Sequence, residues 1–412
     1  MIADLDPTRY CDHVGLWAHQ LEKWLPEVLF DAHVHLGPPE VMGKISAQRQ
    51  RLPLATFTHL SLAQLRGWHA RLFRAKRVAG LVAFPFPLQE VDIAGANRYL
   101  IEVMRAAPEV KGFLLAHPTD LSPSVAAWEA ALAAGVRFHG VKPYFDLLGK
   151  GVFECSMAEF IPETLLRFME AHRLPLMLHT SGSGMGDPAN QRYVRGILER
   201  FPGVKVVLAH MGRYLEADQF FRFCDSGLLD YPGLYLEMSS ATVPAVYSRV
   251  LQQRQVHHRL LFGTDLPFGL ITGMEAWSER AGAIFVTRDR YAWTDEATQQ
   301  ASPVRPDALT YNTYHVIDAF KTALAALRLP AAEEAALKQA VFRRNAESLF
   351  APDGSCAVCS PNEDAATAPI PPGAKRPGTS QDERESYPSA RNHAGCTSVG
   401  KWRGRCAGIA CG

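Results

Sequence analysis

Hydrophobic and polar positions alternate in blocks along most of the chain. Apolar runs typical of buried strands recur eight times, and stretches with the amphipathic spacing of helices separate them. Strands alternating with helices predict parallel βαβ units, and eight such units predict a closed (β/α)8 TIM barrel. The predicted strands cover residues 28–35, 78–84, 110–116, 136–142, 174–180, 204–210, 234–238 and 260–263. The predicted helices cover about 61–76, 90–107, 123–135, 157–172, 189–201, 214–230 and 243–256.

Composition divides the chain into three parts. Residues 1–27 are predicted to form a short helical lead-in, and residues 28–351 are predicted to form the barrel with its closing helices. Within the barrel part, residues 266–310 form an insertion of mixed polarity that we expect to contribute to a lid over the barrel. Residues 352–412 are rich in Pro, Gly, Ser and Ala, so they predict a disordered tail that cannot bury enough apolar surface to fold.

The charge balance argues against nucleic acid and membranes as partners. Lys and Arg number 43 against 42 Asp and Glu, without the clustered basic excess that nucleic-acid binding requires. Apolar runs stay below the roughly 18 residues of a membrane helix. The acidic start of the chain lacks the apolar core of a secretory signal, and only three of the eight cysteines precede residue 352. These features predict a cytoplasmic enzyme without a disulfide framework.

The first predicted strand ends in a pair of histidines, His33 and His35. Side chains two residues apart share one face of a strand but not of a helix. Gly37-Pro38-Pro39 breaks the strand directly afterwards, so both imidazoles are expected side by side at its carboxyl end. Two imidazoles in this arrangement can supply two ligands to a divalent metal.

Four later strands also end in polar residues that can carry chemistry. Barrel active sites are built at the carboxyl ends of the strands, which surround one mouth. The intervals of 37 and 31 residues between successive members match one βα unit, and the interval of 55 matches two. The members are Lys142, His179, His210 and Asp265.

Each of these residues alone is also compatible with a hydrogen-bonded strand cap, and only the ordered set points to a metal site. Lys142 by itself is also compatible with a partner for a substrate carboxylate or with half of a buried ion pair. Tyr144 and Arg213 lie close to the mouth by sequence and are candidate substrate contacts.

With this set of motifs, residues 28–351 resemble the amidohydrolase superfamily. Within it they are similar to the amidohydrolase 2 group, which includes aminocarboxymuconate semialdehyde decarboxylase. The resemblance implies His33, His35, His179 and Asp265 as metal ligands. It implies His210 as a catalytic histidine in one-metal members, or as a ligand of a second metal. Lys142 matches a lysine that two-metal members carboxylate, and the run His210-Met-Gly-Arg213 departs from the expected His-Leu-Gly-Gly.

Imidazoles and a carboxylate suit Zn²⁺ best, with Mn²⁺ or Fe²⁺ as alternatives, at one or two ions per chain. On this hypothesis, the metal activates a water molecule and Asp265 moves its proton to the leaving group. His210 polarises the substrate carbonyl or stabilises an oxyanion. The expected function is hydrolysis of a C–O or C–N bond in a small ester, lactone or amide.

Two other functions stay open at this stage. The family that the chain resembles also contains metal-dependent, non-oxidative decarboxylases of small carboxylic acids. A catalytically silent barrel that acts as a binding module is the third alternative, and the complete ligand set argues against it. The expected partner is a small-molecule substrate, and a homodimer is compatible with the sequence because barrel enzymes are often dimeric.

Overall fold

Eight parallel strands in chain order form the centre of the protein. The computed structural model describes residues 5–279 and 282–351. Each strand pairs in parallel with the next one along the chain, from the first to the eighth. The strands are β1 (Val28–His35), β2 (Arg77–Phe84), β3 (Val110–Ala116), β4 (Gly140–Pro143), β5 (Leu176–Leu178), β6 (Val206–Leu208), β7 (Leu234–Glu237) and β8 (Leu260–Leu261).

Backbone hydrogen bonds from the segment that follows β8 to β1 close the sheet into a barrel. Ala32 donates to the carbonyl of Phe262 at 2.8 Å, and Asp265 donates to the carbonyl of His33 at the same distance. Val34 and Leu266, the next residues along the two segments, form a parallel bridge. The predicted TIM barrel is therefore confirmed.

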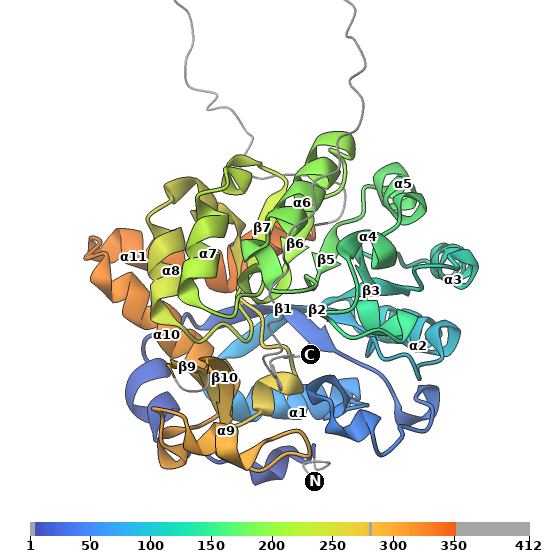
Figure 1. Ribbon diagram of the computed structural model, residues 1–412. Helices are drawn as coiled ribbons and strands as arrows, with labels where there is room; N and C mark the ends of the chain where they lie inside the picture. Colours follow the sequence, from blue (N-terminus) through green and yellow to red (C-terminus); the bar gives the residue numbers. More distant parts are fainter. Residues whose placement is uncertain (1–4, 280–281, 352–412) are drawn as a thin grey trace, which may run out of the picture. The chain divides into compact units, whose positions relative to one another are not determined.

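Helices connect the strands and surround them. In Figure 1 they follow one another around the strands, from α2 and α3 on the right, through α5 and α6, to α7 and α8 on the left. Two longer helices and their continuation follow the insertion. The helices are α1 (Leu62–Leu72), α2 (Ile93–Ala106), α3 (Ser122–Ala133), α4 (Met157–Phe160), α5 (Glu163–His172), α6 (Pro188–Arg200), α7 (Ala217–Cys224), α8 (Pro244–Leu251), α10 (Asn312–Ala326), α11 (Ala331–Gln339) and α12 (Asn345–Leu349).

Local sequence signals fix where several helices begin. Ser61 and Gln64 form a capping box at the start of α1, where each side chain bonds the other residue's backbone N–H. Asp187 caps α6, whose first residue is Pro188. The single helix expected over 157–172 is wrong, since Pro162 stands between α4 and α5 and ends the first of them.

Three predicted strands are shorter than expected. The sequence predicted strands over 136–142, 174–180 and 204–210, whereas pairing is confined to β4, β5 and β6. The polar ends of β5 and β6, at His179 and His210, leave the sheet, whereas β4 lacks the first residues predicted for it and keeps Lys142 paired with Leu115. At β6 the reason is visible in the backbone, because His210 has φ 55° and Met211 φ 54°, which are incompatible with a strand.

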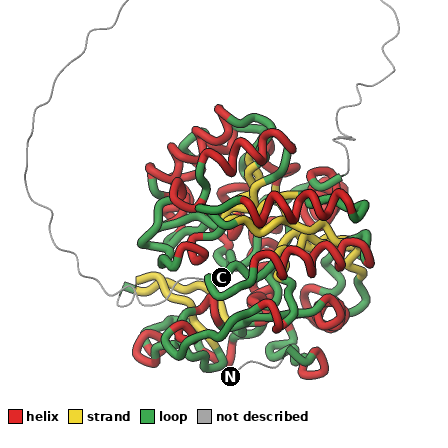
Figure 2. The backbone as a smooth tube through the Cα atoms, turned by 90° about the vertical axis from the view of Figure 1, so that its right-hand side faces the viewer, coloured by secondary structure: helices red, strands yellow, loops and turns green. Residues whose placement is uncertain are grey.

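The insertion contains a β-hairpin that the sequence did not predict. Strands β9 (Gly273–Ser278) and β10 (Gly282–Thr287) pair antiparallel, and the short helix α9 (Glu296–Gln300) follows them. Figure 2 shows the hairpin strands apart from those of the barrel. Residues 280–281 between the two strands lie outside the described chain.

Aromatic and aliphatic side chains fill the interior of the barrel. Phe30, Phe113 and Val207 belong to this inner cluster. Phe350, which follows α12, stacks on Phe30 with ring centroids 6.3 Å apart. The apolar cluster thus occupies the end of the barrel that α12 covers, and polar side chains gather at the carboxyl ends of the strands.

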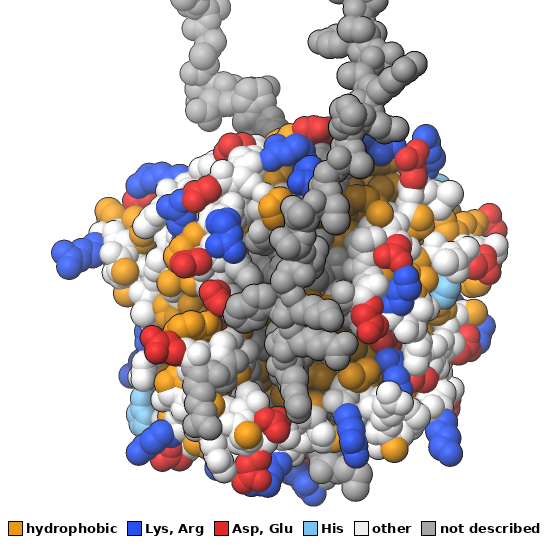
Figure 3. Space-filling view, viewed as in Figure 1, with side chains coloured by type: hydrophobic (Ala, Val, Ile, Leu, Met, Phe, Trp, Pro, Cys, Tyr) orange, Lys and Arg blue, Asp and Glu red, His pale blue; other side chains and the backbone are white. Residues whose placement is uncertain are grey.

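The two remaining parts of the chain are only partly described. In the predicted lead-in, Pro7–Arg9 form a 3-10 turn and Trp17–Leu21 a π-helix. The predicted tail, residues 352–412, lies outside the described residues. Within residues 5–279 and 282–351, Cys11, Cys155 and Cys224 are free thiols, and none of the helices is both long and apolar enough to span a bilayer. Figure 3 shows acidic and basic side chains interspersed on the described surface of the face it presents.

Candidate metal centre

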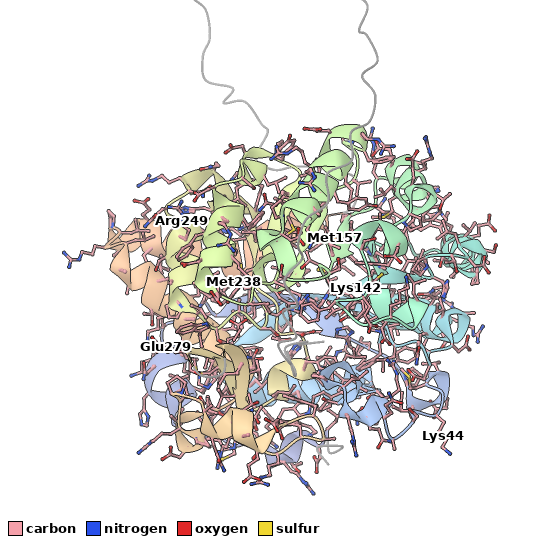
Figure 4. The ribbon with its side chains drawn as sticks, viewed as in Figure 1. Lys44, Lys142, Met157, Met238, Arg249 and Glu279 are labelled. Carbon is pink, nitrogen blue, oxygen red and sulfur yellow. The ribbon has the colours of Figure 1, made fainter. Side chains whose placement is uncertain are left out.

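Six side chains that the sequence analysis singled out reach the carboxyl-terminal end of the barrel, and all six are buried. These side chains come from five strands, and the parallel pairing of the strands brings their carboxyl ends together at one end of the barrel. Figure 4 shows one of them, Lys142, among the central elements, whereas the exposed Lys44 lies at the periphery. They are His33 and His35 on β1, Lys142 on β4, His179 after β5, His210 after β6 and Asp265 after β8.

Two imidazoles point at one carboxylate oxygen. His33 Nε2 and His35 Nε2 each lie 3.2 Å from Asp265 Oδ1. None of these three atoms makes a hydrogen bond with any residue in the described part of the chain, and all three are buried. Buried polar atoms almost always have a hydrogen-bond partner, so three buried atoms that face one another without one need a common partner. A divalent cation meets that need, because each atom can offer it a lone pair.

Hydrogen bonds to the other ring nitrogens assign the tautomers of both histidines. His33 Nδ1–H donates to Glu237 Oε2 at 2.9 Å. His35 Nδ1 lies 3.5 Å from the carbonyl of Pro85, which can only accept. The proton therefore resides on Nδ1 in each ring, and each Nε2 presents a lone pair to the site. Orientation of a metal-binding histidine by a carboxylate behind it is typical of metal centres.

His210 has the same tautomer as His33 and His35. Its Nδ1 lies 3.2 Å from the carbonyl of Ser239 and 2.9 Å from the Ser239 hydroxyl. That hydroxyl donates to Glu237 Oε2 at 2.7 Å, so it accepts from His210. Nε2 of His210 is again the unprotonated nitrogen and makes no hydrogen bond within the described chain. Ligand atoms of His33, His210 and Asp265 all lie within 4.8 Å of one another.

Burial keeps these groups uncharged. It holds the pKa of His33, His35 and His210 well below 6.5, with nearby positive charge on Lys142 as a further cause. Burial, and then the Glu237 carboxylate, raise the pKa of Asp265 well above 3.8. A cation among these atoms would favour the ionised Asp265 and the neutral imidazoles, which are the forms that bind metal.

Lys142 lies against aromatic rings beside the histidine pair. Its Nζ is 4.5 Å from the ring centroid of Phe84 and 5.7 Å from that of Tyr144. The Phe84 ring in turn packs edge-on against His33 and His35, with centroids 4.7 Å apart in both cases. Burial lowers the pKa of Lys142 to about 8, although Asp265 and Glu237 act in the opposite direction.

The ring of His179 packs against the ring of His210, on the side away from β1. Its ring centroid is 5.3 Å from that of His210 and 5.0 Å from that of Tyr144. The compact three-residue group contains His210 and not His179, whereas the resemblance had implied His179 as a ligand. Both histidines are fully enclosed at the mouth, and the ligand role of His179 stays a prediction.

The two predicted substrate contacts are also buried. Arg213 Nη1 donates to the carbonyls of Thr180, at 2.8 Å, and Gly182, at 3.2 Å. Arg213 thus ties the segment after β6 to the one after β5. Tyr144 stacks on Phe145 with ring centroids 4.4 Å apart and flanks His179.

The backbone at three candidate residues, His210, Arg213 and Asp265, is strained. Residues His210 to Arg213 all have positive φ, between 53° and 80°, and only one of them is glycine. Asp265 also has φ 57°. A left-handed conformation costs an L-residue about 1 kcal/mol or more, and such strain concentrates at functional sites.

Two carboxylates of the centre were not among the residues predicted from the sequence. Glu237 ends β7, a strand that the candidate set skipped, although its run from apolar residues into Glu-Met-Ser-Ser carried the same signal as the other strand ends. Asp31 precedes the histidine pair on β1. It accepts hydrogen bonds from Thr264 N at 2.9 Å, Thr264 Oγ1 at 2.6 Å and His69 Nε2 at 2.9 Å. Asp31 therefore joins β1 to the segment that carries Asp265.

Comparisons with known proteins place the chain in a family. The amidohydrolase 2 family model, described as Amidohydrolase, matches residues 30–351. No curated protein matches the chain in sequence.

Several solved structures are similar to the chain. The amidohydrolase 2 from Bifidobacterium longum subsp. infantis is 17% identical, with 79% of this chain and 99% of that chain covered and a TM-score of 0.45. The 4-oxalomesaconate hydratase from Rhodopseudomonas palustris is 16% identical, with 78% and 95% covered and a TM-score of 0.47. The 2,6-dihydroxybenzoate decarboxylase from Rhizobium is 14% identical, with 79% and 98% covered and a TM-score of 0.46.

The family match spans more than three-quarters of the chain, and its bounds coincide with the barrel and closing helices. The resemblance stated from the strand-end motifs is thereby confirmed, and the chain belongs to the amidohydrolase family.

Proposed function

We propose that this protein is a metal-dependent hydrolase that cleaves a C–O or C–N bond of a small molecule. The observation that carries the proposal is the convergence of His33 Nε2 and His35 Nε2 on Asp265 Oδ1, at 3.2 Å each. All three atoms are buried and without a hydrogen bond to the described residues. A site that served only stability would pair these atoms with one another or with neighbours.

His33, His35 and Asp265 would hold the metal, with His210 as a further ligand. The nitrogen-rich donor set fits Zn²⁺ best, and Mn²⁺ or Fe²⁺ remain alternatives. A divalent ion there would supply Lewis acidity and lower the pKa of a water molecule from about 16 to about 7. Two of the donors owe their orientation to Glu237, which bonds His33 directly and His210 through Ser239.

The side chains around this centre then divide the work of hydrolysis. Asp265 accepts a proton from the attacking water and passes it to the leaving oxygen or nitrogen. Lys142, whose ammonium form burial opposes and the Asp265 and Glu237 carboxylates favour, would attract a carboxylate or carbonyl oxygen of the substrate. Tyr144, which flanks Lys142 and His179, and Arg213, in the segment after His210, would contact the rest of the substrate. His210 presents a lone pair, which favours a ligand role over donation to an oxyanion.

Non-oxidative decarboxylation of a small carboxylic acid is the second candidate function. It is favoured by the aromatic surroundings of His35, whose ring lies 4.7 Å from Phe84, 5.3 Å from Phe86 and 5.4 Å from Phe268 between centroids. Such walls suit a flat conjugated acid, and the nearby Lys142 ammonium could hold its carboxylate. Hydrolysis and decarboxylation therefore need to be separated by product.

Metal content per chain is the experiment that tests the proposal. Elemental analysis compares the wild type with Lys142→Ala and with Lys44→Ala, a control at an exposed lysine. Two ions that fall to one only in Lys142→Ala would support a carboxylated lysine and hydrolysis. One ion in all three proteins would make Lys142 a substrate contact.

Product analysis of the metal-loaded protein completes the test. Turnover of aryl esters, lactones or amides without carbon dioxide supports the hydrolase. Carbon dioxide release from hydroxybenzoic or dienoic acids would replace it with the decarboxylase. Absence of tightly bound metal from every variant would overturn both proposals and leave a silent barrel.

A further inference from the structure

A cavity outside the metal centre lies against the β-hairpin of the insertion. It encloses about 410 Å³, within the usual range for small-molecule sites. The hairpin β9–β10 forms one wall, and the segment that leads from His210 into α7 forms the opposite one. None of the candidate metal ligands lines it. Its lining comprises Tyr214, Leu215, Glu216, Ala217, Asp218, Val243, Glu275, Ala276, Trp277, Ala283 and Ile284.

The walls are apolar and include an exposed indole. Trp277 leaves 50% of its surface exposed, although large aromatic residues are usually covered. Ile284, on the paired strand β10, is buried, and Leu215 and Val243 face the cavity from other segments. An exposed ring beside aliphatic walls offers a ligand both apolar contact and an aromatic face.

The charged groups of the lining are all acidic. Glu275 is set into the hairpin wall, where its Oε2 accepts from the Tyr214 hydroxyl at 2.7 Å and from Thr242 N at 3.1 Å. Its Oε1 accepts no hydrogen bond from the described residues. Glu216 and Asp218 are exposed in the opposite wall and form no ion pair within the described chain. Lys, Arg and His are missing from the lining that the structure describes.

We propose that this cavity binds an organic ammonium ion, with its apolar group against Trp277 and Ile284 and its cationic end at Glu275. The indole face and the carboxylates both attract positive charge, while the apolar walls exclude a hydrated metal ion. An anionic ligand would face three carboxylates without a compensating cation in the lining. An uncharged apolar ligand would desolvate Glu275 without giving it a partner.

The state of Glu275 agrees with this ligand class. Burial raises the pKa of Glu275 to about 7, although the hydrogen bonds from Tyr214 and Thr242, and then the charge of Arg213 outside the lining, oppose the rise. Ionising the carboxyl therefore costs free energy that a bound cation would offset. The site is distinct from the metal centre, and the same segment, from His210 to Tyr214, borders both.

Calorimetric titration of the full-length, metal-free protein with phenethylammonium chloride tests the proposal. Phenylacetate, which carries a similar ring with the opposite charge, is the control ligand. Glu275→Gln removes the inner charge, and Trp277→Ala removes the ring. Glu279→Gln makes the same charge change on the hairpin outside the lining, at a residue labelled in Figure 4.

We expect phenethylammonium to bind the wild type and phenylacetate not to bind. Glu275→Gln should weaken binding about ten-fold or more, which corresponds to about 1.4 kcal/mol, and Glu279→Gln should leave it unchanged. Trp277 is exposed, so Trp277→Ala should fold. We expect this variant to bind phenethylammonium more weakly, which tests the site even if Glu275→Gln does not fold. Absence of binding to the wild type, equal binding of phenylacetate, or equal losses in Glu275→Gln and Glu279→Gln would overturn the proposal. Because the protein is metal-free, none of these outcomes depends on the proposed hydrolase activity.

Discussion

His33 donates a hydrogen bond from Nδ1 to Glu237 Oε2 across 2.9 Å, and both side chains are fully buried. The bond joins the first and seventh strands of the barrel. It fixes the tautomer that turns His33 Nε2 toward Asp265 Oδ1. The same Glu237 oxygen accepts from Ser239, which holds His210. One carboxylate thus orients two candidate ligands, from the side of each imidazole opposite the candidate metal site.

Replacing Glu237 should weaken metal binding without removing a ligand. In Glu237→Gln, the amide cannot accept from His33 with the strength of a carboxylate, so the orientation and basicity of the ring are lost in part. We expect metal affinity to fall about 10- to 100-fold, as is typical for residues that support metal-binding histidines. Competition with a chromophoric chelator measures this change.

Glu129→Gln is the matched control, because Glu129 is exposed on α3. Its affinity should equal that of the wild type. Unchanged affinity in Glu237→Gln would mean that His33 is held without Glu237, and the orienting role would be wrong.

Metal should also stabilise the fold. A ligand that binds only the folded state at a hundred times its dissociation constant adds about 2.7 kcal/mol, which for a domain of this size corresponds to about 4 °C in Tm. Zn²⁺ added to chelator-treated protein should therefore raise Tm, as differential scanning calorimetry can follow. His33→Ala should abolish the rise, whereas His258→Ala, at an exposed residue before β8, should retain it. A rise that persists in His33→Ala would place the stabilising ion elsewhere.

The barrel could be predicted from sequence because its strands are buried on both faces. They read as continuous apolar runs rather than as alternating patterns. The run from Val28 to His35 and that from Val110 to Ala116 were predicted to the residue. The polar ends after β5 and β6 were assigned to the strands because hydropathy does not reveal where the backbone leaves the sheet.

The centre could be predicted only as far as its separate strand ends. His33, His35, His210 and Asp265 each follow an apolar run, and barrel topology brings such ends together. The hydrogen bonds behind them depend on side-chain direction, so Glu237 was missed. The hairpin was missed because Glu275 and Ser278 interrupt the apolar pattern of β9, and tertiary contacts rather than periodicity support it.

Arg49 anchors the long segment that follows β1. Its guanidinium bonds Glu90 at 2.8 Å from both Nε and Nη2, and bonds Asp146 at 2.7 Å from Nη1. Asp146 follows Phe145, whose ring lies 5.5 Å from that of His179. Arg49 therefore connects the segment 36–60 to the wall of the candidate site.

Arg49→Met should lower both stability and activity. It leaves the buried Asp146 and the partly buried Glu90 without their shared partner, at a cost of about 1–3 kcal/mol. Urea unfolding measures the loss, and kcat/KM should fall with it. Arg49→Lys should recover only part, because an ammonium cannot form the paired bonds of a guanidinium. Arg51→Met, at an exposed residue of the same turn, should change neither quantity, and an equal effect there would contradict the anchoring role.

The Glu275 carboxyl should make stability depend on pH. Its pKa is raised to about 7 in the folded protein from 4.5, with burial as the main cause. Between these two values the folded state binds more protons than the unfolded state, so the free energy of unfolding falls as pH rises. Because the residue is only half-buried, we expect a loss of about 1–2 kcal/mol from pH 4.5 to pH 8.

The difference between wild type and Glu275→Gln isolates this contribution. The amide does not titrate, so the variant should gain stability relative to the wild type as pH rises through 7. Urea unfolding of the metal-free proteins at several pH values measures the difference, with Glu279→Gln as the control on the same hairpin. A wild-type curve parallel to that of Glu275→Gln would show that the carboxyl ionises freely. In that case the cavity would hold an ordinary solvated carboxylate, and a bound ammonium ion would have no ionisation cost at Glu275 to offset.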